Sequence, residues 1–261
     1  MGAVKCCVIG GMAYRALVTD NFHWPDFLFE FRKSAAECGF AEEVLHETGE
    51  GPLVAFTGGN GDRPIYLSSG IHGDEPAGPL ALLKLMKEGF FDPNTAWAIC
   101  PALNPTGLAA GTRDSAGGMD LNRDYHLRET PEVAAHADWI ERQHQLQLFL
   151  SLHEDYESTG FYFYEINQCD DLPERADAIL ESVSEWFGPE PELIIDDHEV
   201  RMPGWIFHAA EPDLPNGWPE AIFVAKQKKC ILSFTFETPS QMAIQDRIAA
   251  HCAAVKAAIE G

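Results

Sequence analysis

Apolar residues in this chain fall into short continuous runs that alternate with longer segments of helical spacing. A short apolar run bounded by turn residues is typical of a buried strand, whereas apolar residues three and four positions apart predict one face of a helix. The runs predict strands at Leu53–Thr57, Ile65–Ser69, Ala96–Pro101, Leu146–His153, Phe161–Glu165 and Cys230–Thr238. The helical spacings predict helices at Phe27–Cys38, Pro76–Lys87, Pro131–His144, Ala176–Phe187 and Met242–Ile259.

Two long stretches show neither kind of periodicity. Residues 104–125 are polar and rich in glycine, and loops of this length in compact domains are often functional. Residues 188–229 are rich in proline, tryptophan and acidic residues. On the helix predicted at Pro131–His144, His136 and His144 lie on a flank that we expect to face solvent.

Strands that alternate with helices predict an α/β fold, with a mixed, mostly parallel sheet between helix layers. A single domain over residues 1–261 is the simplest organisation, with residues 1–50 as an N-terminal extension to which the sequence assigns no role. In such sheets ligands bind at the carboxyl ends of the strands. Chemically active side chains are therefore expected where the predicted strands end.

Composition narrows the classes of partner. The chain has 261 residues, 46% of them hydrophobic, and a formal net charge of −23. So negative a charge disfavours binding to nucleic acid or to anionic membranes, which are polyanions themselves. No apolar run approaches the roughly 18 residues that a membrane-spanning helix needs, and no signal peptide is predicted. The seven cysteines form no C-x-x-C pair, which favours reduced thiols and a cytoplasmic location.

A histidine and a glutamate with metal-ligand character share one tight turn. His72 and Glu75 stand in the sequence SSGIHGDEPAG, between a predicted strand and a predicted helix. Catalytic zinc needs three protein ligands and an open fourth position. His153 closes a predicted strand, and from there it can face the same crevice as His72. His198 and His208, in the aperiodic segment, are alternative third ligands.

Three further residue types support catalytic chemistry. The glycine-rich loop holds Arg113 and the adjacent pair Asn122–Arg123, and guanidinium groups capture carboxylates and oxyanions in a bidentate manner. Glu237 lies at the end of the strand predicted at Cys230–Thr238, just before a proline. A carboxylate in that position is suited to general acid–base catalysis.

Taken in order, these motifs resemble the zinc carboxypeptidase family. The similarity rests on H-x-x-E at His72, N-P-x-G at Asn104 with the following R and D-x-N-R, a late strand-end histidine, and T-F-E at Glu237. It covers roughly residues 52–240. The short spacing from Arg113 to Asn122 is more similar to the bacterial murein-peptide amidases and to the succinylglutamate desuccinylases and aspartoacylases than to digestive carboxypeptidases.

For the reacting centre, the resemblance implies one zinc ion per chain, held by His72, Glu75 and His153. It implies Glu237 as general base and acid. Zinc lowers the pKa of bound water to about 7, so a neighbouring carboxylate can complete its deprotonation. The resemblance thus implies hydrolysis of a peptide or amide bond.

For the substrate, the resemblance implies that Arg113 stabilises the oxyanion and that Asn122 and Arg123 hold a carboxylate. One departure from the digestive members is the lack of a tyrosine shortly before the catalytic glutamate, because Tyr164 is the last tyrosine of the chain. The large aromatic side chains that are candidates to cover the site instead are Trp205, Phe207 and Trp218.

The acidic residues after His153 allow three interpretations. Glu154, Asp155 and Glu157 either orient the histidine or attract a cationic group of the substrate, and solvent-facing charge is the simpler alternative.

Three functions remain open at this stage. The first is hydrolysis of a peptide or murein peptide beside a free carboxylate, and the second is deacylation of an N-acyl amino acid. The third is a catalytically silent zinc-binding domain, which the presence of Glu237 and of all three ligands disfavours.

Overall fold

An eight-stranded sheet forms the centre of the molecule in a computed structural model that describes residues 22–169, 172–227 and 229–260. The strand order is β1-β2-β4-β3-β5-β10-β6-β9. The strands of this sheet are β1 (Ala41–Thr48), β2 (Gly51–Gly58), β3 (Ile65–Ser69), β4 (Trp97–Cys100), β5 (Leu148–Asp155), β6 (Tyr162–Asn167), β9 (Trp205–Phe207) and β10 (Leu232–Pro239). A separate hairpin pairs β7 (Ile194–Ile195) with β8 (His198–Glu199).

The four central strands, β4, β3, β5 and β10, run parallel to one another. Antiparallel pairs lie on both sides of them, at β1–β2, β2–β4 and β10–β6, and β9 joins β6 in parallel. The predicted mixed, mostly parallel sheet is therefore confirmed. The parallel centre places the carboxyl ends of β3, β5 and β10 side by side.

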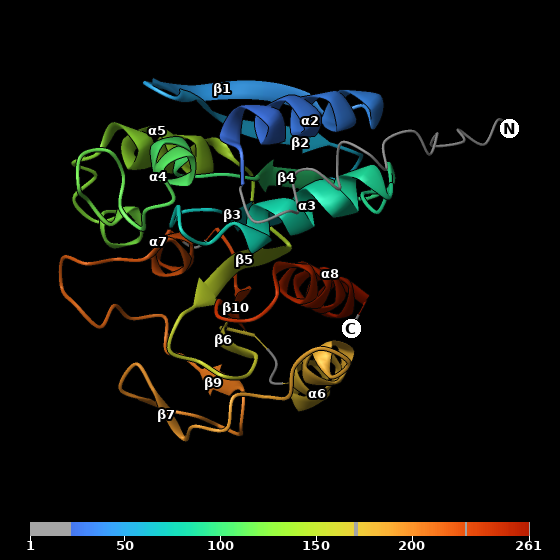
Figure 1. Cartoon of the computed structure of the whole chain (residues 1–261), viewed down its shortest axis with the longest axis vertical. Helices are drawn as coiled ribbons and strands as arrows, with labels where there is room; N and C mark the ends of the chain where they lie inside the picture. Colours follow the sequence, from blue (N-terminus) through green and yellow to red (C-terminus); the bar gives the residue numbers. More distant parts are fainter. Residues whose placement is uncertain (1–21, 170–171, 228, 261) are drawn as a thin grey trace, which may run out of the picture.

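Helices cover both faces of the sheet (Figure 1). One layer holds α2 (Trp24–Glu37), α3 (Ala77–Lys87), α6 (Pro173–Val183) and α8 (Ile244–Glu260), and the other holds α5 (Pro131–Arg142) and α7 (Glu220–Lys226). Strand side chains alternate between the layers: Val54 and Phe56 join the first core, whereas Leu53 and Ala55 join the second. This alternation confirms the predicted placement of the sheet between helix layers.

Residues 22–50 contribute directly to the fold. Trp24, Phe27 and Phe31 of α2 are buried, and the Phe31 ring lies 5.0 Å from the ring of Phe56 in the sheet. Strand β1 was not predicted, because its side chains are mostly exposed and carry no apolar run. Residues 1–21, with Cys6 and Cys7, lie outside the described residues, so the assignment of one domain to the whole chain stays a prediction.

The two aperiodic stretches contain short elements that the sequence pattern does not reveal. The loop at 104–125 holds α4 (Pro105–Ala110) and the 3-10 turn η1 (Leu121–Arg123). The segment 188–229 holds β7, β8, β9 and α7. These elements are too short for a hydrophobic period to be recognisable.

The described residues contain no helix that combines the length and the apolar character needed to cross a membrane. Of the described cysteines, Cys100, Cys169, Cys230 and Cys252 are free thiols. The cellular location stays a prediction.

Candidate active site

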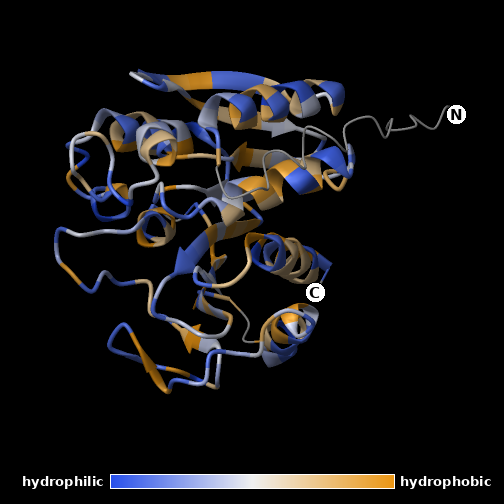
Figure 2. Ribbon diagram, viewed as in Figure 1, coloured by the Kyte–Doolittle hydropathy of each residue, from blue (hydrophilic) through white to orange (hydrophobic). Residues whose placement is uncertain are grey.

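The candidate site lies where three neighbouring parallel strands end. β3 runs into the turn that carries His72 and Glu75, His153 lies near the carboxyl end of β5, and Glu237 lies near the carboxyl end of β10. The polar carboxyl end of β5 is visible as a blue arrowhead in Figure 2. The loop after β4, on the other side of β3, contributes Arg113. This is the edge at which parallel sheets bind ligands.

His72, Glu75 and His153 form a buried group of potential metal ligands. One ligand atom from each lies within 4.8 Å of the others. The Nδ1 atom of His72 is 2.6 Å from Oε1 of Glu75, and Nδ1 of His153 is 3.1 Å from Oε2. All three side chains are at most 6% exposed. The sequence predicted this group, and the structure brings all of it together.

The donor set fits a divalent transition metal. Two imidazole nitrogens with one carboxylate are a ligand set of catalytic zinc in hydrolases. Asp120 accepts from Nε2 of His72 at 3.2 Å, which orients the opposite nitrogen toward Glu75. Burial lowers the pKa of His72, but Glu75 and Asp120 outweigh it and raise that pKa to about 9. The negative charges of Glu75 and Asp120 therefore favour a positive charge at His72.

Asp120 is a site residue that the sequence analysis did not assign. Its Oδ1 also accepts from the backbone N–H of Asn122 at 2.9 Å, and its Oδ2 accepts from Arg113 at 3.2 Å. Burial raises its pKa, yet the hydrogen bond and charge of His72 together with Arg113 lower the pKa well below its ordinary value. The signal that identifies it is its position, immediately before the L-N-R segment.

Asn104 connects the ligand turn to the arginine loop. Its side-chain nitrogen donates to the carbonyl oxygens of Ile71 and Arg113, both at 3.2 Å, and its oxygen accepts from Gly107 N at 2.8 Å. Gly73 and Gly107 touch at this junction, since a Cβ on Gly73 would lie 1.9 Å from the carbonyl carbon of Gly107. The N-P-x-G motif is therefore a positioning device for the ligand turn.

Arg113 approaches the three potential metal ligands, His72, Glu75 and His153, from the side that faces solvent. Its Nη1 lies 3.5 Å from Oε1 of Glu75, and its side chain is 43% exposed. Burial lowers the pKa of the guanidinium, but Asp120 and Glu75 raise it above its ordinary value. The positively charged guanidinium of Arg113 thus contacts Glu75 and is also accessible from solvent.

Glu237 lies next to His153 in the parallel register of β10 and β5, and opposite Tyr162 of β6. Within the described part of the chain, its carboxylate takes part in no hydrogen bond or ion pair. Burial raises its pKa well above the ordinary value, and the negative charges of Glu75 and Asp155 add to this. A carboxylate so placed can accept and return a proton.

Asn122 and Arg123 lie on η1, beside Asp120. Oδ1 of Asn122 accepts from the backbone N–H of Glu220 at 2.9 Å, which leaves its amide nitrogen as the end that can donate to a ligand. Arg123 is exposed, and its Nη1 donates to the Asn122 carbonyl at 2.9 Å. Asn122 and Arg123 thus contribute hydrogen-bond donors to the loop that also carries Asp120.

A buried polar network lies behind the Asn122 loop. Glu220 accepts from Tyr66 and Ser68, each at 2.7 Å, and the Tyr66 hydroxyl contacts Nε2 of His136 at 2.8 Å. Tyr125 contacts Nδ1 of the same ring at 2.7 Å. The expectation that His136 faces solvent is wrong: the ring is 1% exposed, and burial lowers its pKa to about 3. His144 is exposed, as predicted.

The acidic residues after His153 divide into separate environments. Glu154 is buried behind the ligands, where it accepts from Ala77 N at 2.7 Å and pairs with Arg247. A carboxylate buried and paired in this way is not available to attract a substrate, which favours the interpretation in which Glu154 orients its neighbours. Asp155 accepts from the Tyr162 hydroxyl at 3.1 Å, and Glu157 is exposed.

The alternative residues lie elsewhere. His198 and His208 belong to a second group, with Asp213, that is separate from the first. Trp205 is buried in the core at 2% exposure, so the expectation that it could cover the site is wrong. Trp218 stacks on His126 at 4.5 Å, next to the Asn122 loop.

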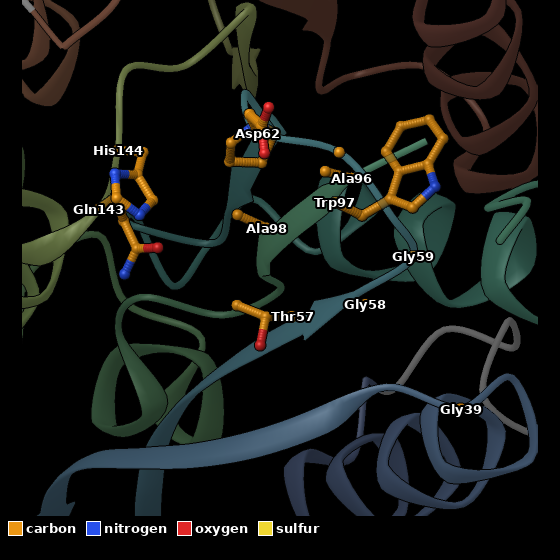
Figure 3. Close-up of a pocket in the computed structure, with 12 residues that line it drawn as sticks. Gly39, Thr57, Gly58, Gly59, Asp62, Ala96, Trp97, Ala98, Gln143 and His144 are labelled. Carbon is orange, nitrogen blue, oxygen red and sulfur yellow. The ribbon is translucent and has the colours of Figure 1, made fainter. Parts of the chain in front are cut away.

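An open pocket of about 420 Å³ lies at the opposite edge of the sheet (Figure 3). It is lined by Gly58, Gly59 and Trp97, with His144 at its side. Trp97 begins β4, and Gly58 ends the antiparallel strand β2 beside it, so the pocket lies at the amino ends of the parallel strands. Because the candidate ligands lie at the carboxyl ends, this pocket is not part of the site.

One family model matches part of the chain. The profile of the succinylglutamate desuccinylase/aspartoacylase catalytic domain matches residues 62–186, which include the metal group and the loop from Arg113 to Arg123 but end before Glu237. The predicted resemblance to this branch of the zinc carboxypeptidase family is confirmed. The matched family is hydrolytic, which supports an enzyme. Among curated proteins, none matches the chain.

Several solved structures share the fold. A provisionally named metallopeptidase from Shewanella amazonensis SB2B is 23% identical, with a TM-score of 0.78 over 90% of this chain and 92% of that chain. A metallo-carboxypeptidase from Burkholderia cenocepacia is 18% identical, with a TM-score of 0.66 over 90% of this chain and 67% of that one. A murein-tripeptide amidase from Escherichia coli O157 is 17% identical, with a TM-score of 0.53 over 83% of this chain and 93% of that one. At these identities the likeness shows the fold alone.

Proposed function

We propose that this protein is a zinc-dependent hydrolase that cleaves a peptide or amide bond next to a free carboxylate. The observation that carries the proposal is the convergence of the buried His72–Glu75–His153 group with Arg113 and Glu237 at one sheet edge. Any one of these features alone could have a purely structural role. Ligands, a base and a fixed cation in one place are the parts that metal-assisted amide hydrolysis needs.

Glu237 acts as general base and then as general acid. When bound, zinc supplies an activated water and polarises the scissile carbonyl. The Glu237 carboxylate accepts a proton from the water and passes it to the leaving nitrogen. Its raised pKa suits the second step, because burial and the nearby negative charges help the carboxyl group to hold the proton until it is transferred.

Arg113 stabilises the negative charge that develops on the carbonyl oxygen. Its guanidinium is oriented by Asp120, so little reorganisation accompanies the reaction. Loss of one such preorganised donor typically costs about 3–4 kcal/mol of transition-state stabilisation.

Asn122 and Arg123 hold the free carboxylate of the substrate. The amide nitrogen of Asn122 and the exposed guanidinium of Arg123 are both donors, and they lie one residue apart on η1. Binding through two donors fixes the register of the substrate relative to the metal group.

A second candidate is deacylation of an N-acyl amino acid, which the family match favours. Its substrate also carries a free carboxylate beside the amide, so the same residues serve both reactions. Product identity distinguishes them.

The test is incubation of the zinc-loaded protein with C-terminally varied peptides, murein peptides, and N-succinyl and N-acetyl amino acids, followed by mass spectrometry. We expect products with wild type and with the exposed-residue control His144→Ala, but not with His72→Ala. The product class then selects peptide or acyl substrates. Equal product from wild type and His72→Ala contradicts the proposal, and zinc binding without any turnover favours the silent domain.

A further inference from the structure

A second group of metal-ligand side chains lies between α6 and α7. His198 belongs to β8, His208 follows β9 directly, and Asp213 lies in the loop that leads to α7. The Nε2 atom of His198 is 3.5 Å from Oδ2 of Asp213, and Nε2 of His208 is 3.5 Å from Oδ1. The proposed hydrolysis uses none of these three residues.

The spacing of these atoms fits a central ion better than a direct contact. Hydrogen bonds from nitrogen to oxygen span about 2.7–3.2 Å, so 3.5 Å is too long for a good one. Ligands that each lie about 2.0–2.1 Å from tetrahedral zinc are separated by roughly 3.3 Å. The carboxylate also uses a different oxygen for each ring. The three side chains therefore surround a point rather than pair with one another.

Both imidazoles are held with Nε2 toward this point. The Nδ1–H of His208 donates to the carbonyl oxygen of Ala209, which leaves its Nε2 as the acceptor and ligand nitrogen. The rings of His198 and His208 lie 4.7 Å apart, and the Tyr164 ring packs edge-on against both. Two protonated rings at this separation would repel each other, whereas two neutral rings share a cation.

The backbone presents His198 at a fixed place. Asp196 and Asp197 adopt left-handed backbone angles, with φ of 48° and 64°, in the turn between β7 and β8. The Tyr164 hydroxyl donates to Asp196 at 2.8 Å, which fastens this turn to β6. His208 is fixed by the pairing of β9 with β6. Two of the three ligands are thus anchored to the sheet.

We propose that His198, His208 and Asp213 form a second site for a divalent transition metal, with zinc as the ion that the donor set fits best. Three protein ligands leave the remaining positions to water. The ion ties the β7–β8 hairpin to the loop that runs to Trp218 and Glu220, which contact the Asn122 loop. It therefore stabilises one wall of the candidate active site, and it does so whether or not the hydrolysis proposal holds.

The first test is zinc stoichiometry of the full chain, stripped with chelator and reloaded, by elemental analysis. We expect His198→Ala/His208→Ala to bind about one equivalent less than wild type, and the exposed-histidine control His144→Ala to match wild type. His72→Ala removes the other equivalent, so failure of one site is distinguishable from failure of the other. Unchanged zinc content in the double variant overturns the proposal.

The second test uses wild-type protein and does not depend on the folding of a variant. Histidine modification by diethyl pyrocarbonate is mapped by peptide mass spectrometry, with and without zinc. We expect zinc to protect His198 and His208 but not His144, which stays exposed in either state. Equal labelling of His198 and His208 in both conditions contradicts the site.

Discussion

Asp120 acts on two parts of the candidate site at once. One carboxylate oxygen holds His72 and the other holds Arg113, so the same residue fixes a metal ligand and the cation beside it. A hydrogen-bonded carboxylate behind a ligating histidine orients the ring and makes its nitrogen more basic. The affinity for metal and the position of Arg113 are therefore coupled.

Replacing Asp120 should weaken metal binding. We expect Asp120→Ala to lower zinc affinity by about 10–100-fold, the usual effect of losing such a partner. Asp120→Asn keeps an acceptor for His72 and should lose less. Competition against a chromophoric chelator measures both constants, and an unchanged affinity in Asp120→Ala would rule out this role.

At the residue scale, the sequence predicts the side chains that are candidates to bind metal or transfer a proton. It does not predict those whose role is to position other side chains. His72, Glu75, His153 and Glu237 have suitable chemistry at strand ends. Asp120 opens the D-x-N-R motif, but its role was missed because it depends on contacts with His72 and Arg113 that the sequence does not reveal. His136 was misplaced because its buried partners come from distant segments, so the helical pattern around it reads as polar.

At the scale of elements, the turn that carries His72 and Glu75 packs directly against α4, where Gly73 contacts Gly107. A Cβ on Gly73 would overlap the backbone of Gly107, and a Cβ on Gly107 would overlap the Asn104 side chain and the carbonyl oxygen of Thr112. Asn104 closes the same junction by hydrogen bonds to Ile71 and Arg113. The turn after β3 therefore keeps its shape only while this contact stays free of side chains.

Gly73→Ala should disrupt this junction. We expect a loss of stability of about 1–3 kcal/mol or more, typical of overpacking, together with loss of zinc binding. Gly49→Ala is the matched control, because nothing lies within 4 Å of a Cβ there. Denaturant melts and zinc titrations measure both effects. Normal zinc binding by Gly73→Ala would show that the Gly73–Gly107 contact is not needed to hold the turn, which would contradict this account.

Long elements were predictable from the sequence, and short ones were not. β3 has the predicted bounds, and α3 differs by one residue. α4, α7 and the strands of segment 188–229 span too few residues to show a period, and tertiary contacts fix them instead. α8 was predictable because its apolar face repeats over many turns.

At the scale of the whole molecule, a buried titratable network joins Glu220 of α7 to Tyr66 and Ser68 of the sheet. Burial raises the pKa of Glu220 from its ordinary 4.5 to about 7, although hydrogen bonds from Ser68 and Tyr66 oppose the rise. The folded state thus binds more protons than the unfolded state between these values. Glu220 therefore makes the protein less stable as the pH rises through that range.

The pH dependence should follow Glu220 specifically. We expect wild type to lose stability relative to Glu220→Gln between about pH 4.5 and 7, with no further relative change above that. Denaturant unfolding of both proteins across this range provides the measurement. Parallel stability curves for the two proteins would contradict the assignment.

The overall architecture was predictable in class but not in strand order. Alternating strands and helices imply a parallel centre between helix layers, which the structure confirms. That β4 lies between β2 and β3, and β10 between β5 and β6, depends on long-range pairing that no local pattern encodes. This order is what brings His72, His153 and Glu237 to one edge.

The most direct test of the central claim compares wild type with Glu237→Gln, in zinc content and in turnover of an identified substrate. The account predicts equal zinc content and a fall in kcat of about 10²–10⁴-fold, because the substitution removes the base and leaves the ligands intact. Turnover close to wild type in Glu237→Gln, or wild-type turnover that survives complete removal of zinc, would contradict it.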